Sequence, residues 1–138
     1  LQVWYQFNLF VNSLITDKIT LIKIRIIFDM GYLYLIVAII SEVIATSALK
    51  ETLGFSKLLP SLIVVIGYST SFYFLSLVLK YLPIGITYAI WSGAGIVLLN
   101  LIGYLIFNQK IDMIGLIGIA LIISGVVLIQ GFSSTVNL

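Results

Sequence analysis

The sequence predicts an all-α membrane protein with four transmembrane helices in each subunit. Of its 138 residues, 62% are hydrophobic and only 9% are charged, whereas soluble domains carry roughly 25% charged residues. The apolar residues also form long runs, and a helix needs roughly 20 of them to cross a hydrocarbon core of about 30 Å. Only helices and closed barrels satisfy their backbone hydrogen bonds in lipid, and unbroken apolar runs favour helices.

Residues 1–29 differ in composition from the rest of the chain, because they mix polar and basic residues with apolar ones. Three of the seven basic residues, Lys18, Lys23 and Arg25, lie here. These charges follow the apolar stretch, which is not the order found in a signal peptide. Met30 directly precedes a clean apolar span, so we expect it to be the natural start, with 1–29 an N-terminal extension from upstream sequence. The alternative is an amphipathic helix lying at the membrane interface.

Four apolar spans follow the extension, and each predicts one membrane-crossing helix. The first is expected at about 32–49 and the second at about 58–79, where Pro60 falls in the opening turn and its missing N–H costs little. The third is expected at about 85–107 and the fourth at about 113–131. The links are short, so neighbouring helices run antiparallel and no extramembrane domain fits between them.

The basic residues leave the orientation of the helices balanced. Counted from residue 30, the first and third links hold three Lys residues and the second link holds one, a weak asymmetry under the positive-inside rule. Including the extension reverses the bias to four against three. This balance suits a protein inserted in both orientations and assembled as an antiparallel homodimer. The alternative is a single orientation that obeys the small bias.

Glu42 is a lone carboxylate within the first span, which contains no basic residue. A charge at bilayer depth is expensive and marks a site for ions, protons or cationic solutes. Removal from water favours the neutral form of a carboxyl group, whereas an arriving cation favours the ionised form. We therefore expect Glu42 to bind protons and cations in turn. A structural Glu bonded to a neighbouring helix is the alternative, although the other spans hold no Lys, Arg or His.

Small and aromatic residues accompany this carboxylate. Ala45 and Thr46 share its helical face, and small side chains there leave space for a guest. Aromatic faces attract organic cations by roughly 0.5–2 kcal/mol each, although aromatic residues near span ends also populate membrane interfaces. The candidate substrate-binding residues are Tyr32, Tyr68, Ser71, Phe72, Tyr88 and Trp91.

Glycines mark two further features of the spans. Gly93 and Gly95 fall in the middle of the third span, where glycine weakens a helix and indicates a hinge. Gly118 and Gly125 lie on one face of the fourth span, a pattern typical of a close-packing seam between helices.

The absence of Cys and His limits the chemistry of this chain. It excludes disulfides and metal sites built from thiolates or imidazoles. A single membrane carboxylate without such partners offers little for catalysis. We therefore expect no enzyme activity, no cofactor and no metal.

These residues together resemble the small multidrug resistance transporters, over the chain from Met30 to about Phe132. The similarity is carried by SEVIAT around Glu42, GYSTSFYFLSLVLKYLP in the second span, YAIWSGAGIVLL in the third and GLIGIALIISGVVLI in the fourth. The resemblance implies that residues 30–138 form a four-helix subunit of an antiparallel homodimer in the bacterial inner membrane.

The same resemblance implies a function and roles for the residues. It implies export of lipophilic and quaternary ammonium cations in exchange for protons, with Glu42 binding protons and substrate in turn. The aromatic candidates would form a cage for the cation, and Gly118 and Gly125 would form the dimer interface. The partners implied are protons, lipophilic cations, lipid and a second copy of the chain.

Two residues favour the quaternary-ammonium and multidrug branch. Guanidinium-exporting relatives typically carry a Trp at the position of Ala45, and they usually lack a Tyr at the position of Tyr68. Ala45 is expected to widen the cavity beside Glu42, which favours bulky cations. Two alternatives remain: an exporter of guanidinium or small amines with the same fold, and a structural membrane subunit without transport activity.

Overall fold

This computed structural model describes residues 2–132, and all of the regular secondary structure in this range is helical. Four stretches are long and apolar enough to cross a membrane: Asp29–Thr52 and the whole of α2, α3 and α4. This confirms the prediction of four helices of membrane-spanning length. The elements are α1 (Gln2–Leu49), the short 3-10 turn η1 (Lys50–Thr52), α2 (Leu58–Val78), α3 (Ile84–Leu105) and α4 (Met113–Phe132).

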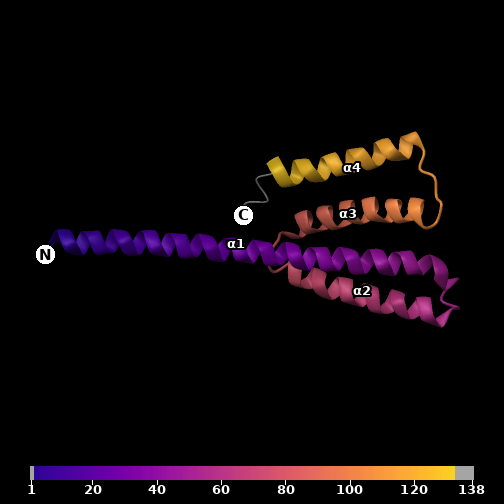
Figure 1. The fold of residues 1–138 in the computed structure, drawn as a ribbon, viewed down its shortest axis with the longest axis horizontal. Helices are drawn as coiled ribbons and strands as arrows, with labels where there is room; N and C mark the ends of the chain where they lie inside the picture. The colour runs from indigo at the N-terminus through magenta and orange to yellow at the C-terminus, as the bar shows by residue number, and fades with distance from the viewer. Residues whose placement is uncertain (1, 133–138) are drawn as a thin grey trace.

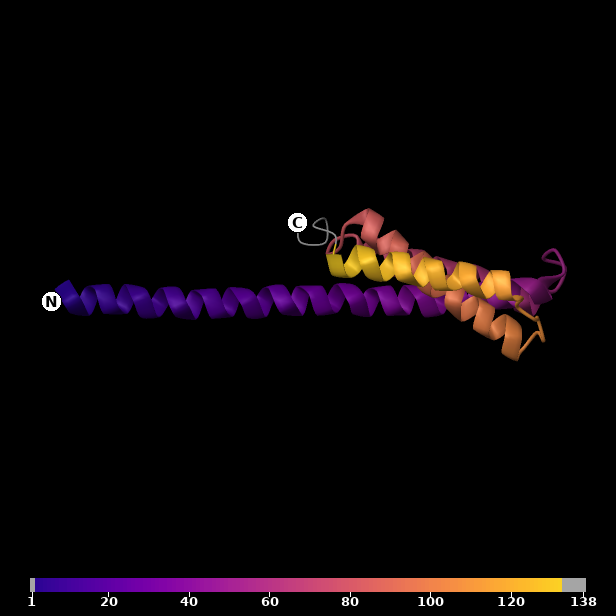
Figure 2. The ribbon, with the colours of Figure 1, turned by 90° about the horizontal axis from the view of Figure 1, so that it is seen from above.

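Helix α1 begins far upstream of residue 32, where the first span was expected to start. Residues 2–30 contain no Gly or Pro, so nothing in this segment ends or kinks the helix. The first part of α1 projects beyond the other helices (Figures 1 and 2). Between residues 13 and 29, every side chain that the structure describes is exposed. This segment is therefore helical and lies outside the bundle, and its assignment as a separate extension stays a prediction.

The four spans form an up-and-down array in which neighbours in the sequence run antiparallel. Helix α1 lies between α2 and α3, and α4 packs on the far side of α3 (Figure 1). Where α1 and α3 end, the Lys50 ammonium lies 4.1 Å from the centroid of the Phe107 ring, which is a cation–π contact. The first and third links therefore lie at the same end of the bundle.

Helices α1 and α2 approach closely because small residues face one another. A Cβ added at Gly67 would lie 2.8 Å from the Ala45 Cβ and 3.0 Å from the Ser41 carbonyl oxygen. Ala45 and Ala38 are completely buried, and the Ser71 hydroxyl donates a hydrogen bond of 2.8 Å to the Ala38 carbonyl. Small side chains let membrane helices pack backbone to backbone. We call this contact the α1–α2 seam.

The buried apolar core continues from the seam toward the α2–α3 link. Its buried members come from α1, from the end of α2 and from the link: Leu35, Ile39, Val43, Val78 and Leu82. Partly buried residues of α3, among them Trp91 and Leu98, pack against this core. The core thus holds α3 against the face of α1 that α2 leaves free.

Helix α4 differs from the others because none of its residues is buried. It contacts α3 where Val126 packs on Gly93, since a Cβ at that glycine would lie 2.7 Å from the Val126 Cγ2 atom. Near its end, the Gln130 side-chain amide donates a hydrogen bond of 3.2 Å to the Tyr32 hydroxyl of α1. Most of the α4 surface is therefore open in a single chain.

Candidate functional site

Glu42 is partly buried in the membrane-spanning part of α1. Its Oε1 accepts a hydrogen bond of 2.9 Å from the Thr46 hydroxyl, because residues four apart share one helix face. The Thr46 oxygen lies 2.8 Å from the Tyr68 hydroxyl of α2. Since the single Thr46 proton goes to Glu42, Tyr68 donates to Thr46. The three groups thus form a chain of hydrogen bonds that runs from α2 to the carboxylate.

The second carboxylate oxygen of Glu42, Oε2, faces α3. It lies 3.2 Å from the position that a Cβ would take at Gly95, so the missing side chain of this glycine leaves room for the carboxylate. A hollow of about 210 Å³ opens here, and its lining residues are Glu42, Tyr88, Trp91, Ser92, Gly95, Ile96 and Leu99. One oxygen is therefore held by α1 while the other is presented to an open space.

Aromatic side chains continue from the hydrogen-bonded chain to the hollow. The Tyr68 and Phe72 rings stack with their centroids 6.4 Å apart. Phe72 meets the edge of Trp91 at 6.2 Å, and Trp91 meets Tyr88 at 5.5 Å. Edge-to-face and offset arrangements at these separations are favourable. Four of the predicted binding residues therefore form one aromatic row from α2 to α3 beside Glu42.

Two of the predicted binding residues lie elsewhere. Ser71 is fully buried and donates its hydrogen bond within the α1–α2 seam. Tyr32 pairs with Gln130 of α4 near the start of the first span. Neither lines the hollow around Glu42 in a single chain, and their roles in binding stay predictions.

The two glycines of the predicted hinge make room for different neighbours. Helix α3 is continuous from Ile84 to Leu105 and includes both of them. Gly93 accommodates Val126 of α4, whereas Gly95 accommodates the Glu42 carboxylate. These contacts give each glycine a packing role, and the hinge stays a prediction.

The small size of Ala45 predicted a wider cavity beside Glu42, and this prediction is wrong. Ala45 is completely buried and faces Gly67 of α2, whereas the free oxygen of Glu42 faces α3. The two residues are three apart and share one helix face, but Ala45 packs on α2 whereas the longer Glu42 side chain reaches α3. The Ala45 methyl group therefore closes the α1–α2 seam.

Thr46 and Gly95 contact the carboxylate, although the sequence analysis gave Thr46 no role in the site and assigned Gly95 to a hinge. The spacing of four from Glu42 was a usable signal for Thr46, since it places the hydroxyl one turn along the same face. Gly95 gave no such signal, because its contact with Oε2 exists only once α3 packs on α1.

The Glu42 carboxylate has no permanent cationic neighbour in the other spans. Helices α2, α3 and α4 contain no Lys, Arg or His, and the partner that the structure gives this carboxylate is the neutral Thr46 hydroxyl. Within the described residues, no three His, Cys, Asp or Glu side chains gather in a group that could hold a metal ion. The described structure therefore gives this carboxylate no ion pair with another span.

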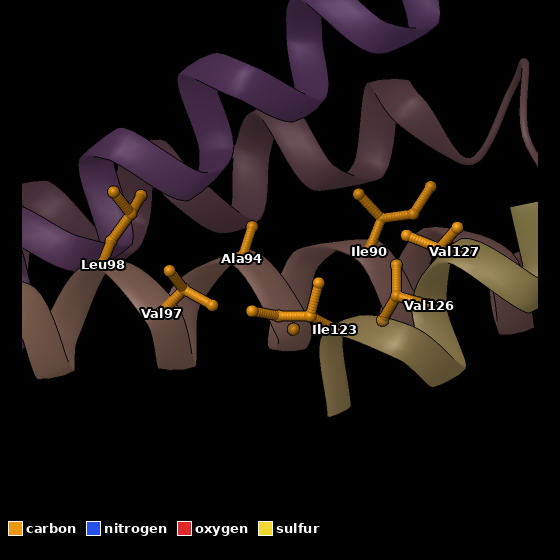
Figure 3. Close-up of a pocket in the computed structure, with 8 residues that line it drawn as sticks. Ile90, Ala94, Val97, Leu98, Ile123, Val126 and Val127 are labelled. Carbon is orange, nitrogen blue, oxygen red and sulfur yellow. The ribbon is translucent and has the colours of Figure 1, made fainter. Parts of the chain in front are cut away.

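A second hollow lies between α3 and α4 and has a different chemistry. Its volume is about 410 Å³, and the side chains around it come from both helices (Figure 3). Its lining residues are Ile90, Gly93, Ala94, Val97, Leu98, Ile123, Val126 and Val127. None of them carries a polar side chain, so this larger hollow has nothing that could select a charged ligand.

Comparison with known proteins shows similarity of the chain to one family. The model of the family described as Small Multidrug Resistance protein matches residues 30–122. The quaternary ammonium compound-resistance protein QacE of Escherichia coli is 56% identical over 100 residues, which cover 72% of this chain and 91% of that protein.

Two further relatives extend this similarity. A putative ethidium bromide resistance protein of Salmonella typhimurium is 54% identical over 98 residues, covering 71% of this chain and 85% of the relative. The quaternary ammonium compound-resistance protein QacH of Staphylococcus saprophyticus is 48% identical over 106 residues, covering 77% of this chain and 99% of the relative. The similarity thus covers 85% or more of the length of each of these relatives.

Proposed function

The chain belongs to the small multidrug resistance family, and on this basis we propose that it exports lipophilic and quaternary ammonium cations in exchange for protons. The names of its relatives, which refer to resistance against quaternary ammonium compounds and ethidium bromide, support this substrate class. The observation that carries the proposal is the position of Glu42, a membrane carboxylate that opens onto a hollow beside Trp91 and Tyr88.

The two oxygens of Glu42 have separate tasks in this proposal. Thr46 holds Oε1 by a hydrogen bond that Tyr68 supports from α2, which keeps the carboxylate aimed at α3. Oε2 then receives either the proton or the positive charge of the substrate. Because both ligands need the same oxygen, binding of one excludes the other, and exchange requires no separate coupling device.

The aromatic row supplies the apolar part of the binding site. Trp91 and Tyr88 line the hollow directly, and Phe72 lies against Trp91 from α2. Aromatic faces attract organic cations by roughly 0.5–2 kcal/mol each and tolerate varied ligand shapes. This combination of one charge and several rings suits bulky lipophilic cations.

We further propose that two copies assemble as an antiparallel homodimer in the bacterial inner membrane. The open surface of α4 supports this, since a Cβ added at Gly118 or Gly125 would meet nothing within 4 Å. Two copies bring two Glu42 carboxyls to one chamber. The near balance of basic residues between the two ends suits subunits inserted in both orientations.

Two carboxyls also suit the energetics of exchange. Each proton that moves inward gains about 1.4 kcal/mol per pH unit and about 2.3 kcal/mol per 100 mV of membrane potential. Export of one monovalent cation uses the membrane potential only if more than one proton returns. Rocking of the helices, with bending near Gly93 and Gly95, would open the chamber to each side in turn.

The deciding experiment compares the two glutamates of the chain in proteoliposomes. Glu42→Gln removes the proposed exchange site, whereas Glu51→Gln removes an exposed carboxylate just beyond it in η1. We expect uptake of tetraphenylphosphonium driven by a pH gradient to disappear in the first variant and to persist in the second. Normal uptake by Glu42→Gln would refute the exchanger and favour a structural subunit.

The same vesicles separate the two transport alternatives. A guanidinium exporter should take up guanidinium under a pH gradient and leave tetraphenylphosphonium outside. We expect the reverse preference, because guanidinium is too small to fill the hollow beside the aromatic row.

A further inference from the structure

Two buried side-chain atoms among the described residues have no hydrogen-bond partner: the Thr87 hydroxyl oxygen and the Trp91 indole nitrogen. Thr87 is only 1% exposed. Buried polar groups are rarely left unpaired in native proteins, so each such group calls for an explanation. Both residues belong to α3, and their spacing of four places them on one face of the helix. The two residues with unpaired groups therefore lie one helical turn apart on the same face of α3.

Thr87 departs from the pattern of the other helix hydroxyls. Ser47, Ser61, Ser92 and Ser124 each donate to the backbone carbonyl four residues earlier, over 2.6–2.7 Å. The corresponding carbonyl for Thr87 belongs to Pro83, and it accepts only the Thr87 backbone N–H, over 2.9 Å. The Thr87 hydroxyl is thus available to a group outside the backbone.

The two unpaired groups have complementary chemistry. The Trp91 indole N–H is a donor only, whereas the Thr87 hydroxyl both accepts and donates. A single water molecule between them could accept from Trp91 and donate to Thr87, and buried waters in proteins usually occupy sites with two to four such partners. The pairing would satisfy both groups at once.

We propose that Thr87 is a positioning residue that holds the Trp91 indole through one shared buried water. The indole lies between Phe72 and Tyr88 in the aromatic row and lines the hollow beside Glu42. Fixing its nitrogen edge fixes which part of the ring faces that hollow. The water site stands on the geometry of α3 alone, and only its consequence for cation binding rests on the proposed function.

The indole resonance of Trp91 tests the water site directly. The chain has two tryptophans, so Trp4→Phe leaves Trp91 as the only indole in a ¹⁵N-tryptophan-labelled full chain in micelles. We expect a cross-peak between the Trp91 Nε1–H and a bound water in this parent protein. No variant at Thr87 is needed for this measurement, and absence of the cross-peak would overturn the proposal.

Variants at Thr87 identify the second partner of the water. Thr87→Val keeps the shape and removes the hydroxyl, so the Nε1–H resonance should move upfield and the water cross-peak should vanish. Thr87→Ser keeps the hydroxyl and should restore both. Thr70→Val makes the same chemical change on α2 and should leave both unchanged. A resonance that ignores Thr87→Val, or that Thr87→Ser fails to restore, would overturn the proposal.

A titration with tetraphenylphosphonium measures the consequence for the cation site. Thr87→Val should weaken binding roughly fivefold, as expected for one lost hydrogen bond of ordinary strength, and Thr87→Ser should stay near the parent value. The resonance is recorded without any cation, so its result decides the positioning role independently. Failure of the parent protein to bind the cation would count against the proposed function instead.

Discussion

The α1–α2 seam and helix α4 both carry small residues at intervals suited to close packing, yet only the seam is closed in a single chain. At the seam, Gly67 already has Ala45 and the backbone of Ser41 within 3.0 Å of a would-be Cβ. On α4, Gly118 and Gly125 have nothing within 4 Å. The same sequence pattern therefore serves folding in one region and leaves the other free for association.

The candidate site lies on the same side of this difference as the seam, on the packed helices. The carboxylate, its Thr46 donor and the aromatic row all lie on α1, α2 and α3, the three helices that share the buried core. Helix α4 adds no residue to the hollow at Glu42. The candidate binding residues therefore lie on the packed helices, and the exposed surface of α4 is free to contact another molecule.

Filling the seam should have the largest effect. Gly67→Val forces a branched side chain against Ala45 and the α1 backbone, and we expect a loss of about 3 kcal/mol in the free energy of unfolding, the upper end for overpacking. Titration with SDS from mild micelles measures it. Gly131→Val, at a glycine of α4 with open space around it, is the control. Equal stability of the two variants would contradict the prediction that the seam is more tightly packed than the surface of α4.

Filling α4 should weaken association while the subunit stays folded. We expect Gly118→Val together with Gly125→Val to weaken dimerisation by about 2 kcal/mol, as overpacking at an interface does. Crosslinking and light scattering in detergent measure the effect. Gly131 lies on the opposite side of the helix from these two positions, so Gly131→Val should leave dimerisation intact. Unchanged crosslinking in the double variant would remove α4 as the interface.

Removing the hydroxyl beside the carboxylate should affect binding without affecting the seam. Thr46→Val deprives Oε1 of its donor, and a hydrogen bond to a charged group is worth about 1.5 kcal/mol or more. We expect tetraphenylphosphonium to bind about tenfold more weakly, as measured by equilibrium titration. Ser47→Ala is the control, because that hydroxyl bonds only to the Val43 carbonyl of its own helix. Equal affinities would mean that Thr46 does not orient Glu42.

The smallest expected effect is a difference in cation affinity between alanine variants of the two glycines of α3. A Cβ at Gly95 would press on Oε2 of Glu42, so Gly95→Ala should weaken binding of a bulky cation about threefold. A Cβ at Gly93 would meet Val126 and Ile122 of α4, so Gly93→Ala should change stability and leave cation affinity in place. Comparable losses of transport in both variants, with binding unchanged in each, would instead support a hinge at these positions.

Much of the fold followed from local sequence. The spans expected at 58–79, 85–107 and 113–131 correspond to α2, α3 and α4 within two residues at each end. The start of α1 did not follow, because composition changes near Met30 whereas residues 2–30 contain no Gly or Pro that would end the helix. Composition indicates whether a segment prefers lipid or water, whereas a helix ends only where a residue or contact stops it.

The sequence predicted which residues lie near Glu42 better than it predicted their contacts, and their roles in binding stay predictions. Glu42, Tyr88 and Trp91 line one hollow, as their residue types and spacing indicated. Ser71 had the expected polarity and depth, yet its hydroxyl bonds to the α1 backbone. Polarity within a span indicates that a partner exists, and it does not say whether that partner is a ligand or a neighbouring helix.

The sequence by itself determined that four helices are long and apolar enough to cross a membrane, and that one of them carries a Glu with no Lys, Arg or His in the other three, because both follow from residue type and helical period. The tertiary structure alone decided that Ala45 closes a seam, that Gly95 faces the carboxylate and that Thr87 is left without a backbone partner. Such roles depend on the rotation and spacing of helices that are distant in sequence. Many apolar contacts together determine this rotation and spacing, so no single residue in the sequence predicts them.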